Sequence, residues 1–314
     1  MSRSAKKPVM DTITLVALAA TCLWLSPAVG RAHASTRTIT CGPERTIGQA
    51  IKTLKPGDAL LVSGTCDENV VLGQEVDRIT LDGQGTATIN GDPTTFGVAV
   101  RGRGITIRGF TIVGGLQGIA VLDGGSAVID GNTIQDAVMN GITVFRNSTA
   151  NITNNTIQHN PSSGIQLQHS SSAQIGFSGP PSNRVSAPNT IQNNGGAGIQ
   201  ILRASSAQIF SNTIQNNGSH GVTVDRNAQA EIAACSINGN VGDGIRGMRN
   251  AGIDIGTDAT GATPQFDDDT NTGTNGGFGV RCMIGGFVDG RLGALIGTAG
   301  GKGFAESCVD STAP

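Results

Sequence analysis

The sequence predicts an all-β solenoid in which each coil contributes three short strands. Two repeated phrases carry this prediction. A Gly-Ile-x-Val phrase recurs in steps of 23, 23, 34, 23, 23 and 35 residues, at Gly118, Gly141, Gly164, Gly198, Gly221, Gly244 and Gly279. An Ala-x-Ile phrase followed by Asn-Thr-Ile keeps the same phase, with its asparagine at Asn132, Asn155, Asn189 and Asn212.

Each 23-residue unit contains three apolar segments separated by Asn- and Gly-rich pairs. Alternation of apolar and polar residues is typical of short strands with one buried face, and Asn and Gly tolerate the positive φ of tight turns. A leucine-rich repeat is the main alternative because its period is similar. It needs a Leu-x-x-Leu-x-Leu phrase and helix-forming residues, which these coils lack.

The chain divides into four predicted parts. Residues 1–34 read as a secretory signal peptide, residues 35–75 as an N-terminal cap with the first coil, residues 76–290 as the coils, and residues 291–314 as a C-terminal cap or tail. A helix over 46–54 is expected to cover the apolar end of the first coil, because an uncapped solenoid exposes its core.

Six cysteines are present, and an exported chain favours disulfides. Cys41 and Cys66 bracket the predicted capping helix, and Cys282 and Cys308 lie near the other end. We expect these two pairs to form disulfides that staple the caps. Cys235 is expected to stay unpaired and buried.

Removing the signal peptide leaves 17 basic and 22 acidic residues, a net charge of −5. This balance does not favour nucleic acid as a partner. No segment after residue 34 is continuously apolar, so we expect no membrane insertion and a secreted monomer, extracellular or periplasmic. The chain has no Tyr, and its single Trp, Trp24, lies in the signal peptide, so few aromatic platforms exist for stacking.

Across roughly residues 77–290 the repeats resemble the right-handed parallel β-helix proteins of the pectate-lyase-like superfamily. The resemblance implies a single-stranded right-handed parallel β-helix with three short strands in each coil of 23 residues. It also implies that the four repeated asparagines form an internal ladder of stacked amides, with Cys235 in the position of the next rung.

By the same resemblance, the sugar-binding groove runs along the Gly-Ile-x-Val strand and the turn after it. The residue five positions after each repeat glycine is then the one at this edge: Asp123, Arg146, His169, Arg203, Arg226, Arg249 and Ile284. We predict that Arg146, His169, Arg203, Arg226 and Arg249 bind a polymer with one carboxylate per sugar, because an arginine can hold a carboxylate through two hydrogen bonds. The alternative is that Arg-Asn pairs at 146, 226 and 249 are turn chemistry copied with the repeat.

Catalytic residues are harder to assign. Uronate lyases and C5-epimerases need a base near the C5 proton and a cation that neutralises the carboxylate. The best such group lies on two adjacent coils and contains His220, Asp225, Arg226, Arg246 and Arg249. The Asp-Pro-His-Asp motif of alginate epimerases is absent.

No cofactor and no transition-metal site is predicted, because the histidines show no ligand spacing. Asp267, Asp268, Asp269 and Asn271 could hold calcium, although the spacing is not that of an EF-hand and a solvated acidic loop is the alternative. The sequence therefore predicts an exported β-helix that binds an acidic polysaccharide without catalysis. A uronate lyase or epimerase and a structural or adhesive solenoid are the alternatives.

Overall fold

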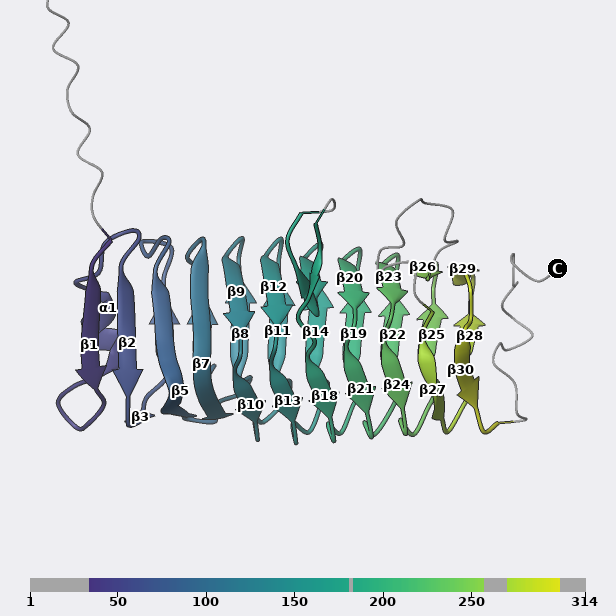
Figure 1. Ribbon diagram of the computed structural model, residues 1–314, viewed down its shortest axis with the longest axis horizontal. Coiled ribbons are helices and arrows are strands. Elements are labelled where there is room, and N and C mark those ends of the chain that lie inside the picture. The colour runs from purple at the N-terminus through teal and green to yellow at the C-terminus, as the bar shows by residue number, and fades with distance from the viewer. Residues whose placement is uncertain (1–33, 181–182, 257–269, 300–314) are drawn as a thin grey trace, which may run out of the picture. The chain divides into compact units, whose positions relative to one another are not determined.

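Alternating apolar residues form the strands of a stack of coils (Figure 1). The computed structural model describes residues 34–180, 183–256 and 270–299. The first strand of each coil belongs to a nine-stranded parallel sheet, the first-strand face. Its strands are β4 (Val70–Leu72), β6 (Val98–Val100), β8 (Ile119–Leu122), β11 (Ile142–Phe145), β14 (Ile165–Gln168), β19 (Ile199–Leu202), β22 (Val222–Asp225), β25 (Ile245–Met248) and β28 (Val280–Met283).

The second and third strands of the coils form the other two faces and belong to one 19-stranded sheet. The second-strand face holds β9 (Ser126–Asp130), β12 (Thr149–Thr153), β15 (Ser172–Ile175), β20 (Ser206–Phe210), β23 (Gln229–Ala233), β26 (Gly252–Ile255) and β29 (Phe287–Gly290). The third-strand face holds β10 (Thr133–Gln135), β13 (Thr156–Gln158), β18 (Thr190–Gln192), β21 (Thr213–Gln215), β24 (Ser236–Asn238), β27 (Thr272–Asn275) and β30 (Ala294–Gly297).

Near the N-terminus the second and third faces are less sharply divided. β5 (Thr80–Gly91) and β7 (Ile105–Gly114) each span both faces, and β1 (Thr36–Thr40), β2 (Ala59–Ser63) and β3 (Thr65–Asp67) precede them. These strands pair in parallel, so the prediction of a parallel β-helix with three strands per coil is confirmed.

The core is a column of aliphatic side chains that stack in register from coil to coil. Ile142 pairs with Ile165 and Val144 with Leu167, and all four side chains are fully buried. Burying one such side chain contributes about 1.5–3 kcal/mol. Because each coil repeats the same inward positions, every coil covers the core of its neighbours.

The repeat glycine before each first strand is required by close backbone contact. A Cβ atom added to Gly141 would lie 2.8 Å from the carbonyl oxygen of Gly164 and 2.6 Å from Cγ2 of Ile157. No larger residue fits between successive coils at this corner. The sequence period therefore marks the place where the coils approach most closely.

The predicted asparagine ladder is confirmed at the corner between the second and third strands. Asn132, Asn155, Asn189 and Asn212 are at most 2% exposed. Oδ1 of Asn189 accepts hydrogen bonds from the backbone N–H and Nδ2 of Asn155, at 2.9 and 3.0 Å, and Oδ1 of Asn212 serves Asn189 at 3.1 and 2.9 Å. Each rung thereby satisfies turn groups of the preceding coil that are shielded from water.

Cys235 occupies the next rung as an unpaired, buried thiol, as predicted. Its Sγ lies 3.4 Å from the carbonyl oxygen of Ile209 and 3.2 Å from that of Ala233, the positions that Nδ2 contacts at other rungs. Burial raises the pKa of the Cys235 thiol to about 12. The amide series resumes at Asn271, whose Oδ1 accepts from the backbone N–H of Cys235 at 3.1 Å.

A second asparagine ladder, which the sequence analysis did not identify, lies at the corner after the third strand. Side-chain bonds of 2.8–3.0 Å join successive members, which are Asn160, Asn194, Asn217, Asn240 and Asn275. Each lies four residues before a repeat glycine, so its signal was a fixed spacing within the repeat that had already been found.

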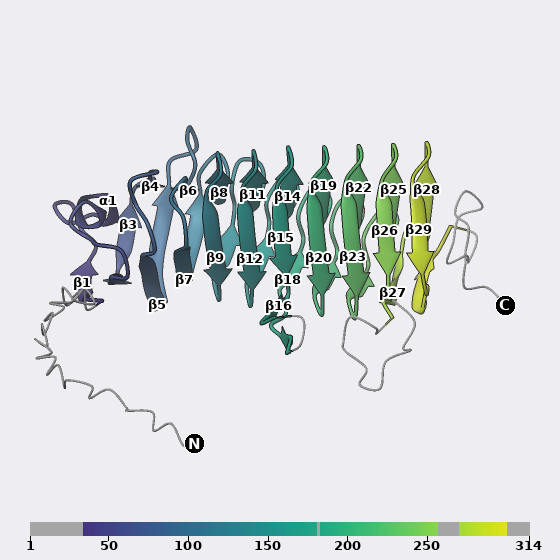
Figure 2. The same cartoon turned by 90° about the horizontal axis from the view of Figure 1, so that it is seen from above.

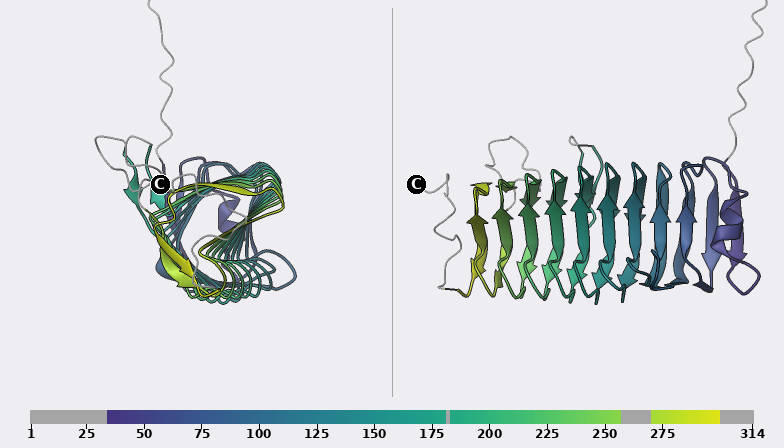
Figure 3. Two further views of the ribbon diagram at one scale, coloured as in Figure 1. Left: turned by 90° about the vertical axis from the view of Figure 1, so that its right-hand side faces the viewer. Right: turned by 180° about the vertical axis from the view of Figure 1, so that it is seen from behind.

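The N-terminal end is closed by helix α1 (Ile47–Ile51), which lies within the outline of the coils (Figure 3). Ile47 and Ile51 are buried and join the core, and Thr46 caps the helix. The Cys41–Cys66 disulfide is confirmed. Cys282 is disulfide-bonded, and its predicted partner Cys308 lies outside the described residues.

The two insertions leave the coils after the second strand. The first forms a short antiparallel hairpin of β16 (Phe177–Ser178) and β17 (Val185–Ser186), which projects from the stack (Figure 2). Most of the second and the predicted signal peptide lie outside the described residues. In the described part of the chain, no helix has the length and apolar character needed to cross a membrane.

Replacing Asn189 by Ala is expected to lower the free energy of unfolding by about 1–3 kcal/mol, because it leaves the buried N–H groups of Asn155 without their acceptor. Urea denaturation followed by circular dichroism measures this. Asn183→Ala, at an exposed position outside the ladder, is the control and should change stability little. Equal stability of the two variants would contradict a stabilising ladder.

Replacing Cys235 by Asn is expected to raise the free energy of unfolding by about 1 kcal/mol, because an amide supplies both the acceptor and the donors that neighbouring rungs use. The same denaturation experiment measures the change. Cys235→Ala removes the thiol without adding an amide and is the matched control. The reasoning fails if the Asn variant is less stable than the Ala variant.

Candidate functional site

The residues predicted to bind a polymer form one row at the end of the first strands, the turn-edge row. It consists of Asp123, Arg146, His169, Arg203, Arg226, Arg249 and Ile284, all with φ between 50° and 59°. This left-handed conformation favours Gly and Asn and is costly for other residues. A turn alone does not call for arginine there, so the four arginines are not explained by turn formation.

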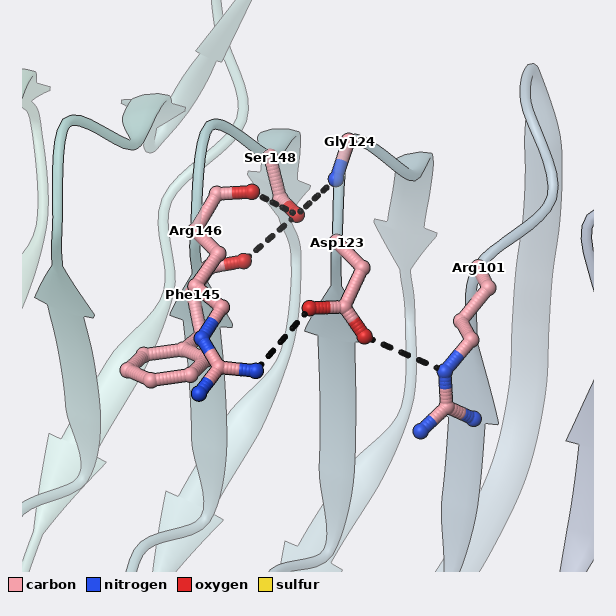
Figure 4. Close-up of polar contacts among 6 residues, drawn as sticks. All are labelled: Arg101, Asp123, Gly124, Phe145, Arg146 and Ser148. Carbon is pink, nitrogen blue, oxygen red and sulfur yellow. Dashed lines mark hydrogen bonds and ion pairs between the residues drawn. The ribbon is translucent and has the colours of Figure 1, made fainter.

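Asp123 is held between two arginines from neighbouring coils (Figure 4). Its Oδ2 lies 3.3 Å from Nε of Arg101, and its Oδ1 lies 3.4 Å from Nη1 of Arg146. The guanidinium of Arg146 also lies over the ring of Phe145, 4.6 Å from its centroid. Two guanidinium groups for one carboxylate leave one positive charge in this group.

The middle of the row contains a histidine that is held neutral. Nη1 of Arg203 lies 2.8 Å from Nε2 of His169, whose ring meets Phe145 edge-on with centroids 4.8 Å apart. Burial, followed by the charges of Arg203 and Arg146, lowers the pKa of His169. A neutral ring carries no charge that could offset the positive charge of Arg203.

Asp225 repeats the pattern of Asp123 near the C-terminal end of the row. Its Oδ2 lies 3.4 Å from Nη1 of Arg249 and 3.8 Å from Nε of Arg226. The carboxylate is nearly buried, whereas the side chains of Arg226 and Arg249 are 45% and 42% exposed. Oδ1 of Asp225 has no hydrogen-bond partner among the described residues.

His220 and Arg246 form a separate group at the start of the same strands. Nη1 of Arg246 lies 2.7 Å from Nε2 of His220, and the backbone N–H of Asp243 lies 2.8 Å from Nδ1. A neutral imidazole has one acceptor nitrogen, so it cannot accept from both donors. Protonation would remove that acceptor too.

The ring is therefore kept neutral. Burial, with Arg246 and Arg281, lowers the pKa of His220, and Asp243 opposes the shift. Nδ1 lies 3.4 Å from Oδ2 of Asp243. That oxygen and Nε of Arg246 are buried without hydrogen-bond partners in the described structure.

The predicted catalytic cluster is thus divided into two groups. His220 and Arg246 contact each other at one end of β22 and β25, and Asp225 contacts Arg226 and Arg249 at the other end. Arg246 pairs in register with Thr223, two residues before Asp225, or roughly 7 Å along the sheet. Asp243, whose backbone N–H and carboxylate lie beside the His220 ring, was not predicted from the sequence.

The two acidic residues of this edge cannot act as a hydrolytic pair. Asp123 and Asp225 lie on strands four coils apart, roughly 19 Å at about 4.8 Å per coil. The carboxylates of glycoside hydrolases lie within about 10 Å of each other.

Metal binding has little support in the described residues. There, the one group of three close potential ligands is Cys41, Cys66 and Glu68, and its two cysteines are joined in a disulfide. Of the predicted calcium ligands, Asp267, Asp268 and Asp269 lie outside the described residues. The Asn271 side chain is buried as a ladder rung.

A family model described as "Right handed beta helix region" matches residues 79–265. No curated protein sequence matches the chain. The structure is similar to pectate lyase Pel9A, with TM-score 0.56 and 11% identity, over 90% of this chain and 81% of that one.

Two modules from Azotobacter vinelandii are also similar. The mannuronan C-5 epimerase AlgE4 A-module has TM-score 0.51 and 13% identity, over 88% of this chain and 89% of that chain. The AlgE6 A-module has TM-score 0.50 and 14% identity, over 89% of each chain. At these identities the likeness concerns the fold.

Acidification is expected to destabilise the fold through His220. Its lowered folded-state pKa favours the neutral ring, so this contribution is complete above the unfolded value of 6.5 and is lost as the pH falls through the folded value. Urea midpoints measured from about pH 7.5 to about pH 5 should fall less in His220→Gln than in the wild type.

The control for this experiment is His159→Gln, because His159 is exposed and outside both groups. It should keep the pH dependence of the wild type. A His220→Gln variant that loses stability as steeply as the wild type would show that the ring is not held neutral.

Proposed function

Because the chain belongs to the right-handed β-helix family, and arginines line one edge of its coils, we propose that it is an exported protein that binds an acidic polysaccharide without catalysis. The binding residues are Arg146, His169, Arg203, Arg226 and Arg249 in the turn-edge row. The polymer would lie across the coils, parallel to the axis of the stack.

The observation that carries this proposal is the left-handed conformation of four arginines. At such a position Gly or Asn has a lower conformational free energy than arginine. The arginine side chains repeat at about 4.8 Å per coil, close to the length of one sugar unit. Guanidinium groups at that pitch match a chain with one carboxylate per sugar.

The charges of this edge favour the same ligand. Asp123 and Asp225 are each shared by two arginines, and Arg203 contacts only a neutral ring among the polar contacts described. The edge is therefore positive although the chain without its signal peptide carries a net charge of −5. An anionic polymer is attracted to this edge and repelled elsewhere.

The fold neighbours are named for polysaccharides, pectate and mannuronan, which is consistent with a polysaccharide partner. The Cys41–Cys66 disulfide supports export to an oxidising compartment.

A uronate lyase or C5-epimerase is the second candidate, and His220 favours it. A neutral imidazole beside Arg246 and Arg281 combines a base with cations that would stabilise a carboxylate. Against it, the single acceptor nitrogen of the neutral ring is already used by the N–H of Arg246 or of Asp243.

Replacing Arg203, Arg226 and Arg249 together by Asn should weaken retention on pectate or alginate by about tenfold or more, because it removes three cations while keeping residues that tolerate the left-handed turn. Retention is measured by affinity electrophoresis at rising salt. The matched control carries the same changes at the exposed residues Arg45, Arg78 and Arg291.

The same samples are monitored in the ultraviolet for unsaturated product, to detect lyase activity, and by proton NMR for C5 epimerisation. Retention that is lost only in the turn-edge variant, with neither change in the polymer, supports the proposal. Product that disappears in His220→Gln supports the second candidate. Equal behaviour of all variants would leave a structural or adhesive solenoid as the better account.

A further inference from the structure

A groove lies on a different face from the arginine row. It has a volume of about 850 Å³ and runs along the second-strand face from β9 to β29, the row of strands seen in Figure 2. Seven coils contribute to it, so it extends for roughly 29 Å at about 4.8 Å per coil.

The floor and walls of the groove repeat with the coils. The floor is a column of alanines, 5–7% exposed, that includes Ala150, Ala173 and Ala207. One wall presents a hydroxyl from each of Thr149, Ser172 and Ser206, which pair in register. The other wall presents the side-chain amides of Asn151, Gln174 and Gln208, also in register.

The C-terminal end of the groove differs from the rest. The amide wall continues there as three carboxylates on successive coils, Glu231, Asp254 and Asp289. Phe287 stands beside them and is 57% exposed. A Cβ atom added to Gly252 would lie 2.8 Å from Cζ of Phe287, so the ring leans over β26 toward the groove.

We propose that this groove binds a neutral, hydroxyl-rich glycan chain. None of the described residues that line it is Arg, Lys or His, so no described lining residue offers a cation to the carboxylates of an acidic polymer. Hydroxyl, amide and carboxylate groups at the pitch of one sugar unit match the donors and acceptors of such a chain. An exposed aromatic ring supplies an apolar surface for the C–H face of a sugar.

The groove and the turn-edge row therefore select opposite kinds of polymer. The row carries an excess of guanidinium groups and the groove carries carboxylates, on different strands of the same coils. The proposal for the groove does not depend on the proposed function, because no residue belongs to both surfaces.

The test is calorimetric titration of the full chain with cellohexaose, laminarihexaose, xylohexaose and mannohexaose. At least one should bind with a Kd of about 1 mM or tighter. Phe287→Ala should weaken that binding about fivefold or more, because it removes the apolar surface of the ring. Ser206→Trp, which fills the groove, should abolish the binding.

Two control variants accompany the titrations. Val241→Ala removes an exposed apolar side chain, 69% exposed, from another part of the surface and should change nothing. The triple Asn variant of the turn-edge arginines should keep the neutral glycan while losing the acidic one. The two proposals can therefore fail separately.

The proposal is overturned if none of the four hexasaccharides binds, or if Phe287→Ala and Ser206→Trp bind as well as the wild type. It is also overturned if calcium alone binds, competes with the sugars and is lost in Asp254→Asn, because the acidic end is then a cation site.

Discussion

The hydrogen bond between equivalent side-chain amides of successive coils is the interaction on which the rest of the structure depends. Backbone pairing sets the distance between coils, but at the two corners beside the third strand it leaves some turn N–H groups without a backbone acceptor. Two series of buried asparagines supply those acceptors, one before and one after the third strand. They hold successive coils in register, and the turn-edge row and the groove share that register.

This constraint explains why side chains at equivalent positions of successive coils form rows along the stack. Once the corners are fixed, a residue at a given position of the repeat has the same direction in every coil. A change of residue type within a row then alters the surface without altering the backbone: Asp123 and Arg146 share one turn conformation and carry opposite charges. In this fold the backbone fixes where surface side chains stand, and the residue types at those positions decide the chemistry of the surface.

Most of the fold could be predicted from the sequence because the repeat is short and strict. The steps between repeat glycines gave the coil length, alternation gave the strands, and the asparagine after the second strand gave the first ladder. The second ladder was missed because its asparagines lie in polar stretches typical of turns, three of them after a Gln-x pair. Burial, which separates Asn194 from its exposed neighbour Asn193, is a property of the folded coil.

The candidate site was predictable only in part. The turn-edge row could be predicted because its members lie five positions after each repeat glycine. The sharing of Asp123 and of Asp225 between two arginines depends on side-chain directions across coils, which the sequence does not give. His220 and Asp225 are close in sequence and were grouped for that reason. His220 precedes β22 and Asp225 ends it, so the extended strand separates the two side chains although they are close in sequence. The groove was missed because its alanines and serines are small and individually unremarkable.

Cys235 has a mechanical consequence. At its level the first ladder has a thiol in place of an amide, while the second ladder continues from Asn217 through Asn240 to Asn275. One corner of this coil is therefore held less firmly than the other. We expect the stack to bend most easily at this coil, where the thiol corner would open while the corner with the intact asparagine ladder stays closed. Arg203, Arg226 and Arg249 lie on this coil and on the coils directly before and after it, so flexing here would change the spacing of their guanidinium groups.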